Sequence, residues 1–154
     1  MLTGVKIFEL KKFVDERGSL TEIMRTDWND LLEDDEITQA NLSISHPDII
    51  RAWHKHERGQ VDYFLVLKGV LKICVYDDKT KELDEIVSSE EKLQIVRIPG
   101  KYWHGFKVVG SKPVMLVYFT TKLYDYENPD ELRRPWEDQN IVPKIINGKT
   151  NDPR

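Results

Sequence analysis

The chain has 154 residues and a mass of 18.1 kDa, and 40% of its residues are hydrophobic, which is enough for one domain with a real core and excludes disorder for most of its length. Its 23 Lys and Arg residues nearly balance 27 Asp and Glu residues, so the net charge of −4 argues against a nucleic-acid-binding surface. No apolar run approaches the roughly 20 residues of a membrane span. The first residues resemble no signal segment, and the single cysteine, Cys74, excludes an intrachain disulfide framework. We therefore expect one cytoplasmic domain over residues 1–154 that binds neither nucleic acid nor a membrane.

The N-terminal third predicts short strands and one helix. Val5–Phe13 and Leu20–Arg25 flank the polar turn Asp15–Ser19. The segment Asp27–Glu36 predicts a short helix, with position 26 or 27 (Thr or Asp) as its N-cap. Ala40–Ser45 alternates in polarity and predicts another strand.

The strongest strand signals lie in the middle of the chain. Residues 63–77 are rich in aromatic, β-branched and Leu residues interrupted by Lys68-Gly69, which predicts a β-hairpin. Lys92–Pro99 and Val114–Thr121 are two further runs. Many short strands separated by Gly and Pro turns predict an all-β fold, an antiparallel sandwich or barrel with few short helices. From about residue 125 to 154, prolines punctuate an extended C-terminal segment.

Three of the four histidines stand where they can meet. His54 and His56 are two positions apart, so on a strand their side chains point to the same face. His104 follows another strand, and Asp62 opens the strand after the His pair. A single histidine on a strand is usually an ordinary hydrogen-bonded residue, and Asp62 alone could be a solvated carboxylate. The combination favours one shared functional cavity.

These residues resemble the two motifs of a cupin, a small jelly-roll barrel with its site inside. The order is His-x-His, an acidic residue, a glycine seven positions later and then Pro-Gly-x-x-x-His. Over about 120 residues the chain more specifically resembles the dTDP-4-dehydrorhamnose 3,5-epimerase family. The matching pieces are Phe13–Glu22, Gln39–Ser45, Arg51–His54, Gly69–Asp77, His104–Phe106 and Tyr118–Tyr124.

The resemblance implies an isomerase that epimerises a nucleotide-linked 4-keto-6-deoxy sugar, with no cofactor. It places the family's general base on His54 and its tyrosine acid on Tyr124. An imidazole suits proton abstraction next to a ketone, and a second group must deliver a proton to the opposite face of the sugar. The resemblance also implies substrate binding by a further set of residues. These are Arg17, Glu22, Gln39, Asn41, Arg51, His56, Gln60 and His104.

The chain departs from the family pattern at three places. Asp62 stands where the epimerases have a lysine that stabilises the enolate. His56 replaces a glutamine two residues beyond the base. The tail Lys144–Arg154 lacks the family's segment with an aspartate that pairs with the base.

These departures leave other functions open. The Arg-x-x-His-x-His pattern is also similar to that of dTDP-sugar 3,4-ketoisomerases, in which His54 and His56 would act as an acid/base pair. Alternatively, the chain is a metal-binding cupin, and His54, His56, Asp62 and His104 hold a divalent metal such as Fe, Mn, Ni or Zn. A cupin that binds a sugar nucleotide without catalysis is the third possibility. The family resemblance further implies a homodimer, and we expect Val5–Phe13 to pair with the edge of a partner's sheet.

Overall fold

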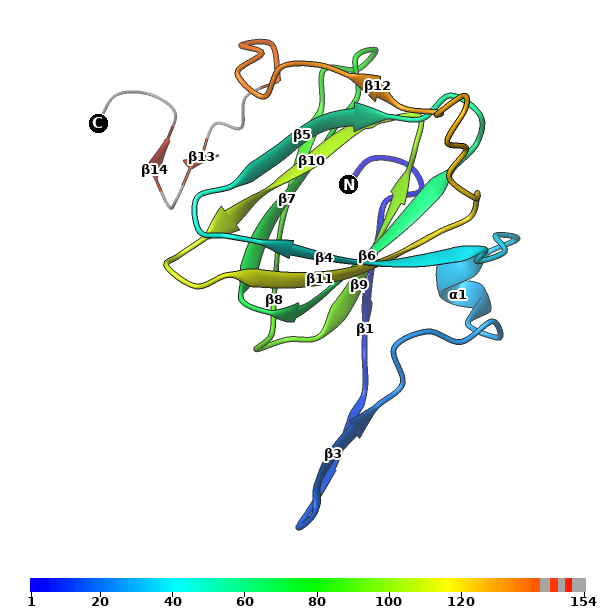
Figure 1. Cartoon of the computed structure of the whole chain (residues 1–154), viewed down its shortest axis with the longest axis vertical. Coiled ribbons are helices and arrows are strands. Elements are labelled where there is room, and N and C mark those ends of the chain that lie inside the picture. The colour runs from blue at the N-terminus through cyan, green and yellow to red at the C-terminus, as the bar shows by residue number, and fades with distance from the viewer. Residues whose placement is uncertain (142–144, 147–148, 151–154) are drawn as a thin grey trace.

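The structure is a computed structural model that describes residues 1–141, 145–146 and 149–150, and its regular secondary structure there is almost entirely antiparallel strands. Two five-stranded sheets face each other, as Figure 1 shows. The first has the order β1-β9-β6-β11-β4, and the second has the order β12-β5-β10-β7-β8. The predicted all-β antiparallel sandwich is confirmed. Within the described residues, no helix is long and apolar enough to cross a membrane.

Each sheet draws its strands from distant parts of the chain. The first sheet contains β1 (Lys6–Glu9), β9 (Gln94–Pro99), β6 (Val61–Lys68), β11 (Val114–Thr120) and β4 (Gln39–Ser45). The second contains β12 (Leu132–Arg133), β5 (Ile50–Lys55), β10 (Trp103–Val109), β7 (Val70–Tyr76) and β8 (Leu83–Ser89). Two short pairs lie outside the sandwich: β2 (Lys12–Asp15) with β3 (Gly18–Thr21), and β13 (Ile145–Ile146) with β14 (Lys149–Thr150).

The predicted hairpin over residues 63–77 is wrong, although both of its strands exist. β6 pairs with β9 and β11 in the first sheet, whereas β7 pairs with β8 and β10 in the second. The chain crosses between sheets at Gly69, whose φ is +80° and where an added Cβ would lie 2.7 Å from the carbonyl oxygen of Pro113. Only glycine suits that backbone and that close approach. The Lys68-Gly69 signal therefore marks a corner between the sheets.

The middle of β6, Tyr63–Leu67, is apolar because both of its faces are covered. Phe64 and Val66 pack in the core between the sheets. Tyr63 and Leu65 point outward and are covered by the short helix α1 (Asn29–Leu32). The helix is shorter than the predicted range 27–36, and the residue before it is Trp28, which makes no capping hydrogen bond through its side chain.

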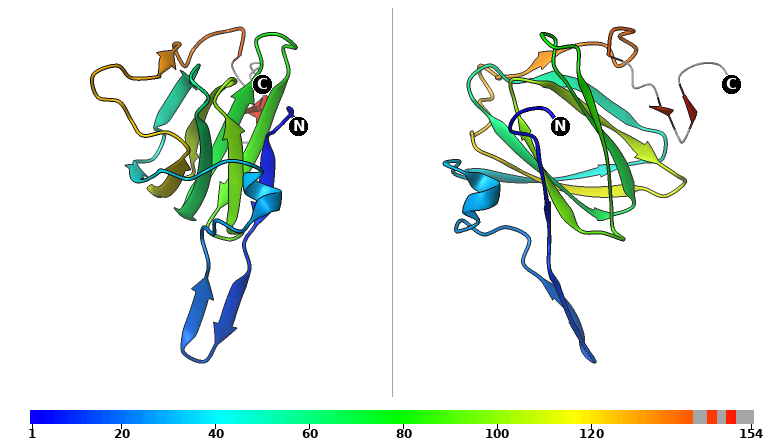
Figure 2. Two further views of the ribbon diagram at one scale, coloured as in Figure 1. Left: turned by 90° about the vertical axis from the view of Figure 1, so that its right-hand side faces the viewer. Right: turned by 180° about the vertical axis from the view of Figure 1, so that it is seen from behind.

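The N-terminal strands also differ from the prediction. Val5–Phe13 is divided between β1, which pairs with β9 of its own chain, and β2. The predicted strand Leu20–Arg25 is represented only by β3, which ends at Thr21. The β2–β3 hairpin extends away from the sandwich, as both views of Figure 2 show.

The C-terminal segment follows the edge of the second sheet. Its strand β12 pairs with β5, and Ile141 packs against the outer face of that sheet beside Trp53 and Cys74. The predicted extension to residue 154 lies partly outside the described residues. The organisation of residues 1–154 as a single domain stays a prediction.

Candidate functional site

A cavity of about 700 Å³ opens between the two sheets, and nine of the residues predicted for the site line it. Strand β4 shows how the sequence builds its polar wall, because Gln39, Asn41 and Ser43 point into the cavity while Leu42 and Ile44 face outward and are exposed. The predicted residues at the cavity are Gln39, Asn41, Arg51, His54, His56, Gln60, Asp62, His104 and Tyr124.

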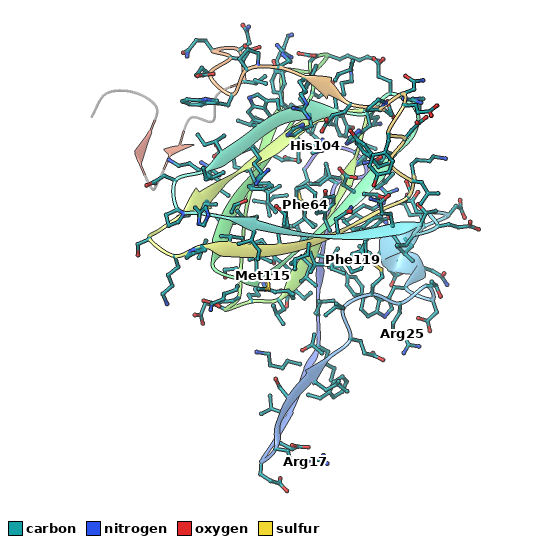
Figure 3. The ribbon with its side chains drawn as sticks, in the orientation of Figure 1. Arg17, Arg25, Phe64, His104, Met115 and Phe119 are labelled. Carbon is teal, nitrogen blue, oxygen red and sulfur yellow. The ribbon has the colours of Figure 1, made fainter. Side chains whose placement is uncertain are left out.

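The three histidines meet because β5 and β10 are neighbours. His54 is directly opposite His104 in the pairing of these strands, and their ring centroids are 6.3 Å apart. The rings of His56 and His104 are 5.3 Å apart. Gly100 lets the chain between β9 and β10 lie against His56, since a Cβ there would lie 2.8 Å from the Cβ of His56. Figure 3 shows His104 within the barrel, above the core residue Phe64.

His56, Asp62 and His104 form a tight buried group. One carboxylate oxygen of Asp62 lies 3.2 Å from Nε2 of His104 and 3.4 Å from Nε2 of His56. Gln60 donates a hydrogen bond of 2.7 Å to the other oxygen. Burial alone would raise the pKa of Asp62, but the hydrogen bonds from His104 and His56 outweigh it and hold that pKa below its usual range. Asp62 is therefore a buried carboxylate.

The other ring nitrogens of this group face backbone carbonyls. Nδ1 of His56 lies 2.5 Å from the carbonyl oxygen of Asp130, and Nδ1 of His104 lies 3.1 Å from that of Tyr102. Each Nδ1 must therefore carry a proton to donate, and each Nε2 faces Asp62. Burial lowers the pKa of His56, but the hydrogen bond and charge of Asp62 outweigh this and raise it. The group can hold extra protons or, in their place, a cation between the Nε2 atoms and the carboxylate.

His54 does not belong to this group, which corrects the predicted four-residue metal set. The ligand atoms of His56, Asp62 and His104 lie within 4.8 Å of one another without it. Nδ1 of His54 is instead 3.0 Å from Oε1 of Glu131, although the direction is poor for a linear hydrogen bond. Burial lowers the pKa of His54, and Glu131 offsets this only in part, so the imidazole is neutral near pH 7.

Glu131 is a site residue that sequence reasoning missed. The family pattern places the carboxylate partner of the base in the tail Lys144–Arg154. In this structure the carboxylate beside His54 belongs instead to the segment before β12. Burial alone would raise the pKa of Glu131, but its hydrogen bond with Arg133 and the nearby His54 outweigh it, so the pKa is lowered and the group is ionised. Only the pairing of β12 with β5 reveals this, and a two-residue strand has no periodic signal.

Two tyrosines border the cavity at different depths. The predicted Tyr124 lies at the mouth, 46% exposed, with its ring 5.1 Å from that of Tyr126. Tyr118, which sequence reasoning did not single out, is half-buried on β11 and packs edge-on against Phe64 at 5.8 Å. Burial raises the pKa of Tyr118, which keeps its phenol protonated. The alternation of β11 could have identified it, because Leu116 and Thr120 line the same wall.

Two predicted substrate-binding residues lie outside the cavity of their own chain. Arg17 is at the tip of the β2–β3 hairpin, far from His104 in Figure 3, and pairs with Asp15. Glu22 pairs with Arg25 on the surface. Cations that do line the cavity are Arg51, Arg58, Lys122 and Arg133.

The comparisons with known proteins agree with this geometry. A sequence profile described as "Polysaccharide biosynthesis C-terminal domain" matches residues 13–132. The chain belongs to this family. It is 42% identical over 138 residues to the probable low-salt glycan biosynthesis epimerase Agl13 of Haloferax volcanii, covering 86% of this chain and 87% of that protein. It is 39% identical over 146 residues to the spore coat polysaccharide biosynthesis protein SpsL of Bacillus subtilis, covering 92% and 94%.

The fold of this family member is that of the sugar-nucleotide epimerases. The crystal structure of the dTDP-6-deoxy-D-glucose-3,5-epimerase RmlC from Legionella pneumophila, in complex with dTDP-4-keto-L-rhamnose, superposes with a TM-score of 0.81. Its sequence identity is 25%, and the match covers 92% of this chain and 78% of that one. The predicted resemblance to dTDP-4-dehydrorhamnose 3,5-epimerases and their cupin-type fold is thereby confirmed.

Proposed function

We propose that the chain is an isomerase that epimerises a nucleotide-linked 4-keto-6-deoxy sugar by proton transfer next to the ketone. The observation that carries this proposal is His54, a neutral imidazole beside the ionised Glu131 at the wall of a polar cavity. A neutral imidazole can accept the proton, and the carboxylate stabilises the imidazolium that results. The epimerase relative at 42% identity and the ligand of the RmlC structure support the reaction class and the substrate class.

The cations of the cavity suit the rest of such a substrate. Arg51 donates through Nε to Ser45, and its guanidinium keeps further N–H groups for a diphosphate or an enolate oxygen. Arg58, Lys122 and Arg133 add positive charge to the cavity wall. Asp62 cannot serve the enolate as the family's lysine does, so we assign that stabilisation to Arg51.

The proton donor to the opposite face of the sugar is one of two phenols. Tyr124 has the family position predicted from sequence, whereas Tyr118 is the deeper residue and stays protonated through burial. Tyr118→Phe and Tyr124→Phe separate them. The variant of the true donor retains deuterium exchange at the abstracted position but loses net epimerisation, and the other variant retains both.

The direct test is an incubation with a dTDP-linked 4-keto-6-deoxyglucose in D2O, followed by NMR of the sugar. Deuterium at C3 and C5 indicates double epimerisation, and deuterium at C3 alone indicates a 3-epimerase. Movement of the ketone to C3 indicates the 3,4-ketoisomerase alternative. The buried His56, with both ring nitrogens already engaged, argues against that alternative. Tight binding without label would identify a non-catalytic sugar-nucleotide cupin.

A divalent metal at His56, Asp62 and His104 is a second proposal, supported by the two Nδ1 atoms that face backbone carbonyls. Metal-bound histidines usually donate their other ring N–H in this way, which leaves Nε2 as the ligand atom. Two imidazoles and one carboxylate suit Fe, Mn, Ni or Zn, and such an ion would polarise the substrate's ketone.

Metal analysis of the purified protein tests this second proposal without reference to activity. We expect bound metal in the wild type and in His54→Asn, and none in His104→Asn or Asp62→Asn. A metal-free wild type that is not stabilised by added Zn²⁺, Mn²⁺, Fe²⁺ or Ni²⁺ would contradict it.

We also propose that the enzyme is a cytoplasmic homodimer. Phe13, Val14 and Leu20 are exposed on the projecting hairpin, and a second copy would cover them. β1 is the edge strand of the first sheet, so its free side remains available for the expected pairing of Val5–Phe13 with a partner, and the hairpin adds a second proposed contact. The buried free thiol of Cys74 is compatible with a reducing compartment.

In such a dimer, Arg17 and Glu22 would bind the substrate in the partner's cavity, as their predicted roles require. Mixing Arg17→Ala with His54→Asn tests this, because a mixed dimer contains one cavity with both intact residues. Recovery of activity on mixing supports the shared site, whereas a protein that sediments as a monomer at micromolar concentration contradicts it.

A further inference from the structure

Four residues on the outer side of the second sheet form a polar cluster beyond the cavity. The guanidinium of Arg134 donates to Asp138 through Nε at 2.9 Å and to Asp78 through Nη1 at 2.8 Å. It lies over the ring of Trp103, 4.9 Å from the centroid. The indole N–H of Trp103 donates to the other oxygen of Asp78 at 2.6 Å. All the strong donors of this cluster are used within it.

The cluster is joined by backbone to the His54–Glu131 pair. The amide of Arg134 donates to the carbonyl of Trp53 at 3.1 Å, and the amide of Trp53 donates back to Arg134 at 3.0 Å. In the adjoining ladder, Arg133 is opposite His54. Glu131 therefore precedes the clamped residue by three positions, directly before the strand that runs beside the base.

Strand β12 has little to hold it in place by itself. It has only two residues, both exposed, on the edge of the sheet. Short edge strands with few buried contacts open at low free-energy cost. On the other side of Glu131, Asp130 accepts hydrogen bonds from the amides of Glu57 and Arg58, both at 2.9 Å. Glu131 is thus held between two anchors, and the second anchor is the Arg134 cluster.

We propose that Asp78, Arg134 and Trp103 act as a clamp that positions Glu131 against His54 from outside the cavity. These are positioning residues, because none of them lines the cavity and they act through β12. The inference rests on the proposed function, since it assigns His54 as the base. Arg134 is required as an arginine: its planar guanidinium can bind two carboxylates and stack on an indole, which a lysine cannot reproduce.

The test compares Asp78→Asn and Arg134→Lys with the control Asp77→Asn. Asp77 is the adjacent carboxylate, and it hydrogen-bonds only within its own turn, to Lys79 and Thr80, apart from its backbone. The first measurement is the exchange of the Trp53 and Arg134 amide hydrogens, followed by NMR. The second is the rate of deuterium incorporation into the dTDP-linked 4-keto-6-deoxyglucose, with kcat and KM determined separately.

We expect both clamp variants to lose protection at these two amides and to lower kcat by about 10- to 100-fold, as displacement of a catalytic group does, with KM unchanged. The control keeps wild-type values. In the double variant Asp78→Asn with Glu131→Gln, the losses should not add, because both changes remove the same interaction.

Three results would overturn the clamp: unchanged amide protection, a kcat equal to that of the wild type, or a full additive loss in the double variant. If the wild type incorporates no deuterium, the proposed function fails instead. Amide exchange then still decides whether the cluster holds β12 in place.

Discussion

Asp62 and Tyr63 are neighbours on β6, yet they belong to two buried polar groups on opposite faces of the first sheet. Outside the sandwich, the Tyr63 hydroxyl donates to Asp35 at 2.5 Å, and Arg97 donates to the same carboxylate at 2.7 Å. Arg97 also donates to the Tyr63 oxygen, to the carbonyl of Gly4 and to Glu33. Every nitrogen of this guanidinium has a partner, and α1 and its flanking loop close the group off.

Inside the sandwich, the polar groups compete for partners. Two imidazoles share one oxygen of Asp62, and Nδ1 of His54 has a near but poorly aligned carboxylate. This group adjoins a cavity, whereas the outer group adjoins packed side chains. The difference indicates that burial and charge alone do not identify a functional site. A functional group keeps unused hydrogen-bonding capacity that faces open space, and a structural one uses all of it.

The largest effect that this comparison predicts is on catalysis. His54→Asn should lower the rate of deuterium exchange by roughly 10²–10⁴, the contribution of a general base, while the thermal unfolding curve changes little. His46→Asn is the matched control, because His46 is exposed in a turn outside the cavity. Full exchange activity in His54→Asn would remove the base assignment and make His56 the next residue to change.

The largest effect on stability should come from the outer group. Arg97→Met leaves Asp35 and Glu33 without their shared cation, and we expect the free energy of unfolding to fall by about 2–4 kcal/mol. Activity per folded molecule should stay unchanged. Arg25→Met is the stability control: Arg25, labelled in Figure 3, also binds two carboxylates, but all three groups are exposed, so little change is expected. If urea denaturation shows the same loss of unfolding free energy in Arg97→Met and Arg25→Met, the distinction between the buried and the exposed group is wrong.

The sequence predicted many of the strands and the meeting of the histidines because both depend on local patterns. Apolar runs marked β6, β7, β9 and β11, and the His-x-His spacing placed two imidazoles on one face. It did not predict β8 or β10, where Glu85, Lys107 and two serines interrupt the apolar pattern. It also assigned β6 and β7 to one hairpin, because a glycine with positive φ marks a hairpin turn and a corner between sheets equally well.

The rest of the site depends on contacts between distant segments. Glu131 and His54 are 77 positions apart in the chain (131 − 54). They meet only because β12 adds to the edge of β5. Nothing in the local sequence around residue 131 distinguishes this glutamate from its solvated neighbours. Arg17 and Glu22 matched the family by sequence, but Arg17 lies at the tip of the β2–β3 hairpin and Glu22 directly follows that hairpin, so neither lines its own cavity.

A smaller and pH-dependent effect is expected from Tyr63→Phe. Loss of the hydroxyl should cost about 1 kcal/mol at pH 7, the usual net value of a buried hydrogen bond. Burial, together with Asp35, raises the pKa of Tyr63 above its ordinary value of about 10. The folded state therefore keeps a proton on Tyr63 that the unfolded chain loses above pH 10, so Tyr63 lowers the stability of the wild type there, a loss that Tyr63→Phe lacks. The gap between the two unfolding free energies should close as pH rises from 9 to 11 in urea titrations; a constant gap would contradict this.

The smallest expected signal is the reactivity of Cys74, which reports on a third buried region, the outer face of the second sheet. Burial raises the pKa of the Cys74 thiol to about 12, and the side chain packs with Trp103 and with Ile141 of the C-terminal segment. At pH 8 almost no thiolate exists in the folded state, so a thiol reagent should label the native protein only as fast as that face opens. Asp78→Asn should accelerate labelling if the Arg134 cluster holds the C-terminal segment down, whereas Asp77→Asn should not. Rapid labelling of Cys74 in the wild type would show that this face is already open to solvent, which would contradict its packing under the C-terminal segment.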